Sequence, residues 1–168
     1  MFKKLFFFLM LICFWVPYSQ AQQIRTTTLG VRASARVYDN LQMLTIRHLD
    51  LINPSIIGNS INVSPITSSY AGMFKIIGNP NARVRITFLQ NEIIEEHYDG
   101  LGEVSAAYSL SAATQDLQSQ SLLLDVGEAI LPIGENGELY VWLGADLDLS
   151  NATPGLYLSE FIIEMEYI

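Results

Sequence analysis

The densest group of chemically active side chains lies in the stretch NEIIEEHYDG. It contains two carboxylates, Glu95 and Glu96, directly before His97, and two more nearby, Glu92 and Asp99. Carboxylates and imidazole are ligands that divalent cations accept, so these residue types at this spacing form a candidate metal site. A charged, solvent-facing loop has the same composition, and this is the interpretation we favour.

A second acidic stretch, GADLDLSNATPG, places Asp146 and Asp148 two residues apart, with Ser150 and Asn151 following. This is how a calcium-binding loop of the EF-hand type begins. Such a loop also needs a glycine at its sixth position and an acid at its twelfth, and both are missing here. We therefore predict no calcium loop at this place.

The other histidine, His48, stands beside Arg47 and near Asp50 in a stretch that alternates like a β-strand. We expect an ordinary strand histidine there. The sequence contains no nucleophile elbow, phosphate-binding glycine loop, HExxH motif or cysteine pair. It therefore predicts a protein that is not an enzyme and that uses no cofactor and no metal.

The first residues have the composition of a secretory signal peptide. Lys3 and Lys4 precede an apolar run from Leu5 to Val16, and small residues follow up to Ala21. The run has twelve residues, fewer than the ~20 that cross a bilayer. We predict a signal peptide over residues 1–21 and no stable membrane span after its removal.

Cleavage after Ala21 would leave 168 − 21 = 147 residues, a length typical of one domain with its own hydrophobic core. We therefore predict a single domain over residues 22–168. The only cysteine, Cys13, leaves with the signal peptide, so no disulfide supports the secreted chain. Its stability must come from packing.

The charges of the predicted secreted chain are unevenly distributed. Seven Lys and Arg residues oppose seventeen Asp and Glu residues, a net charge of −10. Every basic residue lies at or before Arg85, and fifteen acids follow it. Nucleic acid is therefore not an expected partner, because its phosphates would be repelled. The acids are interpreted as a solvated face or, alternatively, as a surface complementary to the chain's own basic half.

Alternation of apolar and polar residues with a period of two recurs along the chain, and no long helical pattern does. Residues 31–37 predict one strand with small inner residues and a basic outer face, and MLTIRHLDLI predicts the next. Two hairpins are expected, one around the turn at 78–81 and one around Asn136-Gly137. SAATQDLQSQS between them predicts a loop or a weak edge strand. The sum is an all-β, immunoglobulin-like antiparallel β-sandwich.

The last strand is predicted to run from Gly155 to the chain end, fourteen residues or about 45 Å. Its odd-numbered residues form the expected core face: Tyr157, Ser159, Phe161, Ile163, Met165 and Tyr167. Strands usually have five or six residues. So long a strand is expected to lie centrally in a sheet, or to await a partner strand.

Three stretches resemble a family of secreted bacterial proteins, the domain of unknown function 4402: FKIIGNPNARVRITF, ELYVWLGADLDL and the closing TPGLYLSEFIIEMEYI. The resemblance covers the chain from about Val31 to its end. Ser159 replaces the second glycine usual in the closing motif. The resemblance implies a β-sandwich secreted by a bacterium to the periplasm, the cell surface or the medium, and no catalytic residues.

The chain is more distantly similar to chaperone-usher pilins and spore-coat-U-type subunits, with Tyr167 next to last and Gly155 fourteen residues from the end. In pilins the final strand borders a groove that a strand from a chaperone or another subunit fills. The resemblance implies a pilin-like or adhesin-like subunit that associates with itself, a periplasmic chaperone or a surface partner. The implied groove wall is Tyr157, Phe161, Ile163, Met165 and Tyr167, and the implied donor residues are Ile24, Leu29 and Val31.

Two alternatives remain open from the sequence. The stretch VRASARV is either part of a donor strand or the first strand of its own sandwich. The protein is either such a subunit or a self-contained module that binds a glycan or a protein. In the second case Trp142 and the aromatic tyrosines would be exposed on the surface.

Overall fold

The computed structural model describes residues 41–98, 100–125 and 127–168. All of them belong to one compact unit, Val37–Ile168. The predicted signal peptide and the predicted strand at 31–37 lie outside the described residues. In the part of the chain that is described, no helix is long and apolar enough to cross a membrane.

The described residues form strands and one short 3-10 helix, η2 (Gln118–Gln120). The strands are β1 (Gln42–Arg47), β2 (Ser60–Val63), β3 (Gly72–Ile77), β4 (Arg83–Phe88), β5 (Asn91–Glu95), β6 (Glu103–Ala113), β7 (Leu122–Leu123), β8 (Glu128–Pro132), β9 (Glu138–Asp148) and β10 (Ile163–Tyr167).

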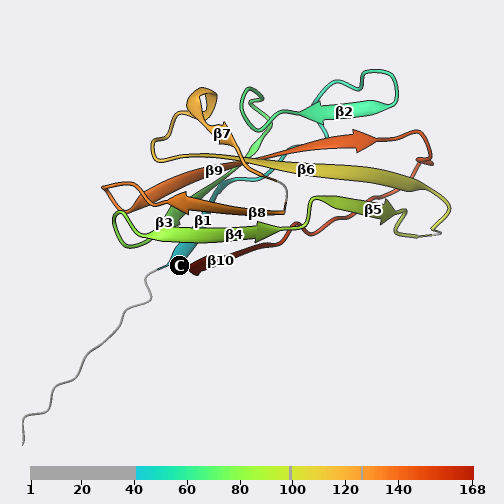
Figure 1. Cartoon of the computed structure of the whole chain (residues 1–168). Coiled ribbons are helices and arrows are strands. Elements are labelled where there is room, and N and C mark those ends of the chain that lie inside the picture. Colours follow the sequence, from blue (N-terminus) through green and yellow to red (C-terminus); the bar gives the residue numbers. More distant parts are fainter. Residues whose placement is uncertain (1–40, 99, 126) are drawn as a thin grey trace, which may run out of the picture. The chain divides into compact units, whose positions relative to one another are not determined.

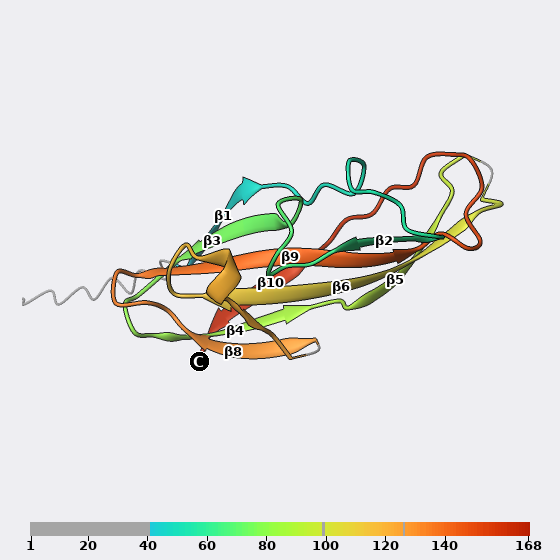
Figure 2. The same ribbon diagram turned by 90° about the horizontal axis from the view of Figure 1, so that it is seen from above.

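These strands form two antiparallel sheets, as an all-β sandwich requires. The larger sheet has the order β1-β3-β9-β6-β5, with β2 also paired to β9 and β7 to β6. The smaller has the order β10-β4-β8. Figures 1 and 2 show β4 between its two neighbours and the long strands β6 and β9 side by side in the other layer. The predicted antiparallel β-sandwich is confirmed.

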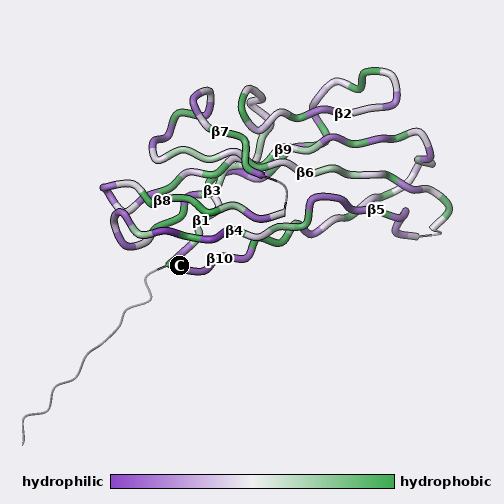
Figure 3. The backbone as a smooth tube through the Cα atoms, viewed as in Figure 1, coloured by the Kyte–Doolittle hydropathy of each residue, from purple (hydrophilic) through white to green (hydrophobic). Residues whose placement is uncertain are grey.

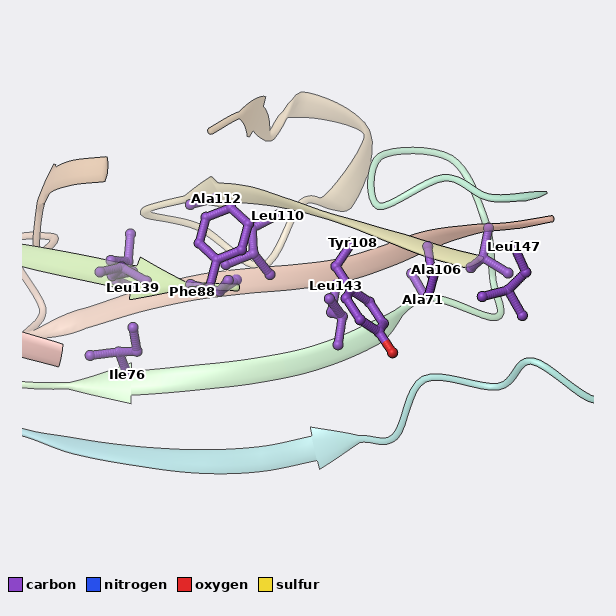
Figure 4. Packing of buried hydrophobic residues seen from close by; sticks show 14 of the residues in the cluster. Ala71, Ile76, Phe88, Ala106, Tyr108, Leu110, Ala112, Leu139, Leu143 and Leu147 are labelled. Atoms are coloured by element: carbon purple, nitrogen blue, oxygen red, sulfur yellow. The ribbon is translucent and has the colours of Figure 1, made fainter. Parts of the chain in front are cut away.

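The core lies between the sheets because the strands alternate. In β9, Leu139, Val141 and Leu143 are buried toward the small sheet, and Val84 and Ile86 of β4 face them from the other side. Figure 4 shows side chains of β6 and β9 filling this space. Figure 3 shows hydrophilic residues at the turns before β4 and before β9. The alternation therefore determines which face of each strand is buried, and the hydrophilic stretches that interrupt it mark the turns.

The two turns that were predicted to form hairpins connect strands of different sheets instead. The chain does reverse at the expected places: the N–H of Ala82 donates to the carbonyl of Asn79 at 3.1 Å, and that of Gly137 donates to Gly134 at 2.9 Å. However, β3 and β9 belong to the large sheet, and β4 and β8 to the small one. The arms therefore do not pair with each other. Each has an apolar face, so they pack face to face across the core, and the prediction of paired arms was wrong.

The polar stretch SAATQDLQSQS begins at the end of β6 and continues through η2 toward β7. Its Gln118 side chain donates to the backbone carbonyls of Pro65 and Ser68 at 3.0 and 2.9 Å. Ser121 donates to Ser111, which in turn donates to Pro65. The predicted loop therefore exists, and hydrogen bonds attach it to the connection between β2 and β3.

The C-terminal segment differs from its prediction in length and position. Only Ile163–Tyr167 form a strand, β10, and it pairs with β4 alone, at the edge of the small sheet. From residue 153 to 162 the chain has no regular ladder apart from a bridge between Glu96 and Tyr157. The predicted facing is confirmed, because Phe161, Ile163, Met165 and Tyr167 pack on the core. The alternation of apolar residues determines which face of the C-terminal segment is buried. It does not determine how many of its residues pair with a neighbouring strand.

Candidate functional site

In the described part of the chain each sheet ends in two edge strands, β1 and β5 in the larger sheet and β8 and β10 in the smaller. Of these, β1 pairs only with β3, and β10 pairs only with β4. The start of β1 and the end of β10 both lie near Gly78, since a Cβ placed there would be 3.3 Å from Leu41 and 2.6 Å from the Tyr167 hydroxyl. Unpaired edges expose backbone N–H and carbonyl groups. Both edges can therefore accept a further strand.

Between β1 and the C-terminal segment a groove of about 1090 Å³ opens toward the core. One wall is β1 and the loop after it, and the other is the segment before β10. Its lining residues are Met43, Thr45, His48, Leu49, Asp50, Leu51, Ile52, Asn53, Phe74, Ile94, Val104, Tyr108, Leu143, Leu147, Leu149, Tyr157, Leu158, Ser159, Glu160 and Phe161. Most are apolar, and the groove reaches the hydrophobic core itself.

The floor of the groove consists of core side chains of the large sheet. Leu143, Leu147 and Tyr108 are each less than a tenth exposed, and Figure 4 shows them on the inner faces of β6 and β9. The Phe161 side chain of the C-terminal segment packs between the two sheets. Its ring centroid lies 4.8 Å from that of Tyr108 and 6.1 Å from that of Phe88. The C-terminal wall is thereby anchored on both sheets.

A polar cluster lies at one side of the groove. The Tyr108 hydroxyl lies 2.6 Å from the Ser159 hydroxyl and donates to Glu92 at 3.1 Å, and Ser159 donates to the same Glu92 oxygen at 2.5 Å. Burial raises the pKa of Tyr108, and this is the largest cause of its shift. The cluster holds Ser159, and with it the segment before β10, against β5 and β6.

The segment before β10 is also held by its backbone. Glu96 is 5% exposed, and its carboxylate accepts the N–H groups of Leu156 and Tyr98 at 3.0 and 2.8 Å. The N–H of His97 donates to the Leu156 carbonyl at 2.8 Å. Tyr157 closes a local loop, because its hydroxyl accepts the N–H of Thr153 and donates to the carbonyl of the same residue, both at 2.9 Å. This wall is therefore attached independently of strand pairing.

The exposed side chains next to the groove are apolar on β1 and both apolar and acidic on the C-terminal segment. Leu44 and Ile46 are exposed on β1, by 45% and 54%. Ile162 on the C-terminal segment is 61% exposed. The even-numbered face of that segment also carries the exposed carboxylates Glu160 and Glu164. Such a surface is suited to a strand that is apolar inward and basic outward.

The predicted groove residues occupy two different places. Tyr157 and Phe161 line the groove. Ile163, Met165 and Tyr167 lie on β10 and pack on the core without lining it. The predicted donor residues Ile24, Leu29 and Val31 lie outside the described residues, so that role stays a prediction.

Sequence reasoning missed two parts of the groove. One is the loop His48–Asn53, in which the Asp50 carboxylate caps the turn by accepting the N–H groups of Ile52 and Asn53 at 2.9 and 3.0 Å. The prediction of His48 in a strand was wrong, since β1 ends at Arg47. The other part is the floor at Tyr108 and Leu143. The turn-forming sequence DLINP was the available signal for the loop, and nothing local marks the floor.

The candidate metal ligands do not converge. Among the described residues no group of three or more His, Cys, Asp or Glu side chains could hold a metal ion. Glu92 contacts Ser159, and Glu96 contacts backbone N–H groups. The His97 ring lies against Tyr98, with centroids 5.2 Å apart. Asp99 lies outside the described residues. The prediction of a charged, solvent-facing loop was also wrong for most of this stretch, because Asn91–Glu95 form β5 and Glu96 is only 5% exposed.

The acids of the second stretch also have local partners. The Asp148 carboxylate accepts the N–H and hydroxyl of Ser150 at 2.9 and 2.6 Å, and these hydrogen bonds lower its pKa. Asp146 accepts from the Asn62 side chain across β2 and β9. Both border a shallow trough of about 590 Å³ on the outer face of the large sheet, lined also by Ser60, Asn91 and Ser105.

Trp142 does not form the exposed aromatic surface that a glycan-binding module was predicted to have. It lies on the outer face of β9 and is only 1% exposed. Its ring stacks on Tyr140, with centroids 6.3 Å apart. Lys75 lies 5.6 Å above the Tyr140 ring. The aromatic residues of this face pack on each other instead of lying open to a sugar.

Comparisons with known proteins do not assign the chain to a family. No family model matches it, so the resemblance to the domain of unknown function 4402 is not confirmed, and no curated protein matches it. One solved structure is similar over 83% of this chain, with 14% identity and a TM-score of 0.37. Its title is "Chaperone-tip adhesin complex is vital for synergistic activation of CFA/I fimbriae biogenesis". The match spans only 40% of that chain's length, and a likeness at this TM-score does not establish relatedness.

Proposed function

We propose that the protein is a secreted, non-enzymatic structural subunit of a bacterial surface or extracellular assembly, and that its groove accepts a β-strand from another molecule. The observation that carries the proposal is the groove itself, which opens the core between the edge strand β1 and the segment that leads into the edge strand β10. A strand laid there would pair with unpaired backbone groups and cover apolar side chains at once.

Secretion is supported by the composition of residues 1–21, and a non-enzymatic role by the chemistry of the groove. Ser159 has a carboxylate and a phenol as its hydrogen-bond partners in the described residues. No imidazole activates it there, as a nucleophilic serine would need. The strand donor can be another subunit or a periplasmic chaperone.

Assembly is tested with the chain expressed from its full-length gene and purified after secretion. We expect light scattering to show slow, concentration-dependent polymers. A variant that lacks residues 22–37 keeps the groove and has no strand to donate, so it should stay monomeric. When mixed with the intact chain it should cap the polymers and shorten them. An intact chain that stays monomeric at every concentration would exclude a second copy as the strand donor, and a truncated variant that polymerises like the intact chain would overturn the proposal.

A second candidate function is that of a self-contained binding module. The trough on the outer face favours it, because Asp146, Asn91 and Ser105 offer polar groups of the kind that hydrogen-bond sugar hydroxyls. A glycan array would test it, with Asn91→Ala as the variant expected to lose binding. No binding to any glycan would remove this candidate.

A further inference from the structure

We propose that two turns at one end of the sandwich, residues 55–60 and 96–102, insert their apolar tips into the surface of a bilayer whose lipids carry no net charge. One tip carries Ile56 and Ile57, and the other carries Tyr98 and Leu101. The inference goes beyond the proposed function, because none of these four side chains lines the groove.

The register of the large sheet brings the two turns to the same end. The first turn leads into β2, whose first residue, Ser60, pairs with Asp148 of β9. On the other side of β9, Ser105 of β6 pairs with the same Asp148. The second turn leads into β6, which begins at Glu103. Figures 1 and 2 show the turn before β2 and the connection between β5 and β6 at one end of the molecule.

The apolar side chains of both turns are open to the surroundings. Their exposed fractions are 61% for Ile56, 78% for Ile57, 80% for Tyr98 and 78% for Leu101. Each pair stands next to a glycine with a φ of +64°, Gly58 in one turn and Gly100 in the other, and a Cβ on either glycine would meet no atom within 4 Å. The turns therefore project from the body of the fold.

The backbone of each turn is closed by its own hydrogen bonds. The N–H of Ile57 donates to the carbonyl of Ser60 at 2.9 Å, and that of Ser60 donates back at 3.1 Å. In the second turn, the N–H of Glu96 donates to the carbonyl of Gly102 at 2.9 Å. Lipid offers no hydrogen bonds, so a segment that enters it must satisfy its backbone groups internally. Closed turns leave fewer such groups to be desolvated than an open loop would.

The charges near the turns select the kind of lipid. Residues 51–74 contain no Asp, Glu, Lys, Arg or His, so the first turn can leave water without burying a charge. The second turn contains Asp99 and stands between Glu95 and Glu103, and neither turn contains a Lys or Arg. Anionic headgroups would be repelled, whereas zwitterionic ones would not. Tyr98 belongs to a residue type that favours the boundary between lipid and water.

The test uses the chain expressed from its full-length gene and purified after secretion. Flotation with phosphatidylcholine vesicles should recover the intact protein in the lipid fraction. One variant carries Ile56→Ser and Ile57→Ser, and another carries Tyr98→Ser and Leu101→Ser. Each should lower the partition coefficient about tenfold or more, because it removes two apolar side chains from the lipid. Melting curves like that of the intact protein show that the variants fold.

The matched control carries Leu122→Ser and Leu123→Ser. These leucines of β7 are similarly exposed, by 75% and 60%, and lie outside both turns, so the control should bind like the intact chain. Added salt should not weaken binding, and phosphatidylglycerol in the vesicles should reduce it. Absence of binding to phosphatidylcholine would overturn the inference. Binding that requires phosphatidylglycerol and is lost in salt would do the same, because charges would then make the contact.

A label on the tip reports insertion directly. The predicted secreted chain contains no cysteine, so Ile57→Cys accepts a single environment-sensitive fluorophore. Its emission should shift to shorter wavelength when phosphatidylcholine vesicles are added, and the same label on Leu122→Cys should not respond. An unchanged emission from position 57 would contradict insertion of this turn.

Light scattering separates this inference from the proposed function. The two turn variants should assemble like the intact chain, because their side chains do not line the groove. Normal assembly without vesicle binding would overturn the inference alone. Vesicle binding by a chain that polymerises equally well without residues 22–37 would overturn the proposed function alone. Turn variants that no longer assemble, with an intact chain that does not bind vesicles, would mark the turns as a contact between chains and overturn the inference.

Discussion

The hydroxyl of Tyr167, the next-to-last residue, accepts a hydrogen bond from the backbone N–H of Asn79 at 2.8 Å. Asn79 belongs to the turn that carries the chain from β3 to β4. The same hydroxyl lies where a side chain at position 78 would begin, because a Cβ on Gly78 would be 2.6 Å from it. The chain end therefore closes the first crossing between the two sheets.

Replacing Tyr167 by Phe removes this hydrogen bond and leaves the ring on the core. We expect a loss of about 1 kcal/mol in the free energy of unfolding, the usual contribution of one such bond. Urea unfolding monitored by circular dichroism measures it. Tyr70→Phe is the matched control, since Tyr70 is 40% exposed and its hydroxyl has no hydrogen bond among the described residues. Equal losses in the two variants would show that the bond is not stabilising.

The core prediction compares two leucines. Leu110 of β6 is fully buried and Leu122 of β7 is 75% exposed. Leu110→Ala should lower the free energy of unfolding by about 2–5 kcal/mol, because it removes buried methyl groups and leaves a cavity. Leu122→Ala should change it by less than about 0.5 kcal/mol. A similar effect of both substitutions would contradict the arrangement of the two sheets.

The sequence predicted the fold class and the turns because both depend on local patterns. The alternation of Val84, Ile86 and Phe88 places these residues in the core, and Asn136-Gly137 does mark a reversal. The pairing of strands was not predictable in the same way. A strand with an apolar face can pair sideways with its neighbour in sequence or pack against it from the opposite sheet, and the local pattern is identical.

The same limit explains what was missed in the candidate site. The C-terminal strand was predicted at fourteen residues because its alternation continues that far, whereas Tyr157 and Ser159 are held by side-chain contacts with no ladder. The groove depends on which edges stay unpaired. That property belongs to the whole sheet order, and no single stretch of sequence contains it.

Trp142 gives a direct check on the outer face of the large sheet. The sequence has two tryptophans, and the other, Trp15, lies in the predicted signal peptide. Because Trp142 is 1% exposed, its fluorescence should be poorly quenched by acrylamide in the folded protein and strongly quenched after unfolding. Added saccharides should leave the emission unchanged. Efficient quenching in the folded state would mean that the aromatic face is open.

The stability of the protein at acid pH should depend on Glu138, which pairs with Lys75. The hydrogen bond from Lys75 is the largest cause that lowers the pKa of Glu138 below its ordinary 4.5. The stabilisation from a lowered carboxyl pKa is present above the ordinary value and is lost as the pH falls through the folded one. Intact protein should therefore melt higher than Glu138→Gln at pH 7, and the difference should vanish as the pH drops below 4.5. A difference that does not change with pH would refute the pairing.

An alkaline prediction tests the groove floor. Burial raises the pKa of Tyr108 above its ordinary value of 10.0, so the unfolded chain loses this proton at a lower pH than the folded one. The folded state therefore loses stability as the pH rises past 10.0, relative to a variant without the phenol.

Tyr108→Phe should be less stable than the intact protein at neutral pH, because the hydrogen bonds to Ser159 and Glu92 are lost. The gap should narrow at alkaline pH, and melting curves of both proteins across this range measure it. A gap that does not change with pH would mean that the Tyr108 hydroxyl is solvated, and that the groove does not reach the core at this point.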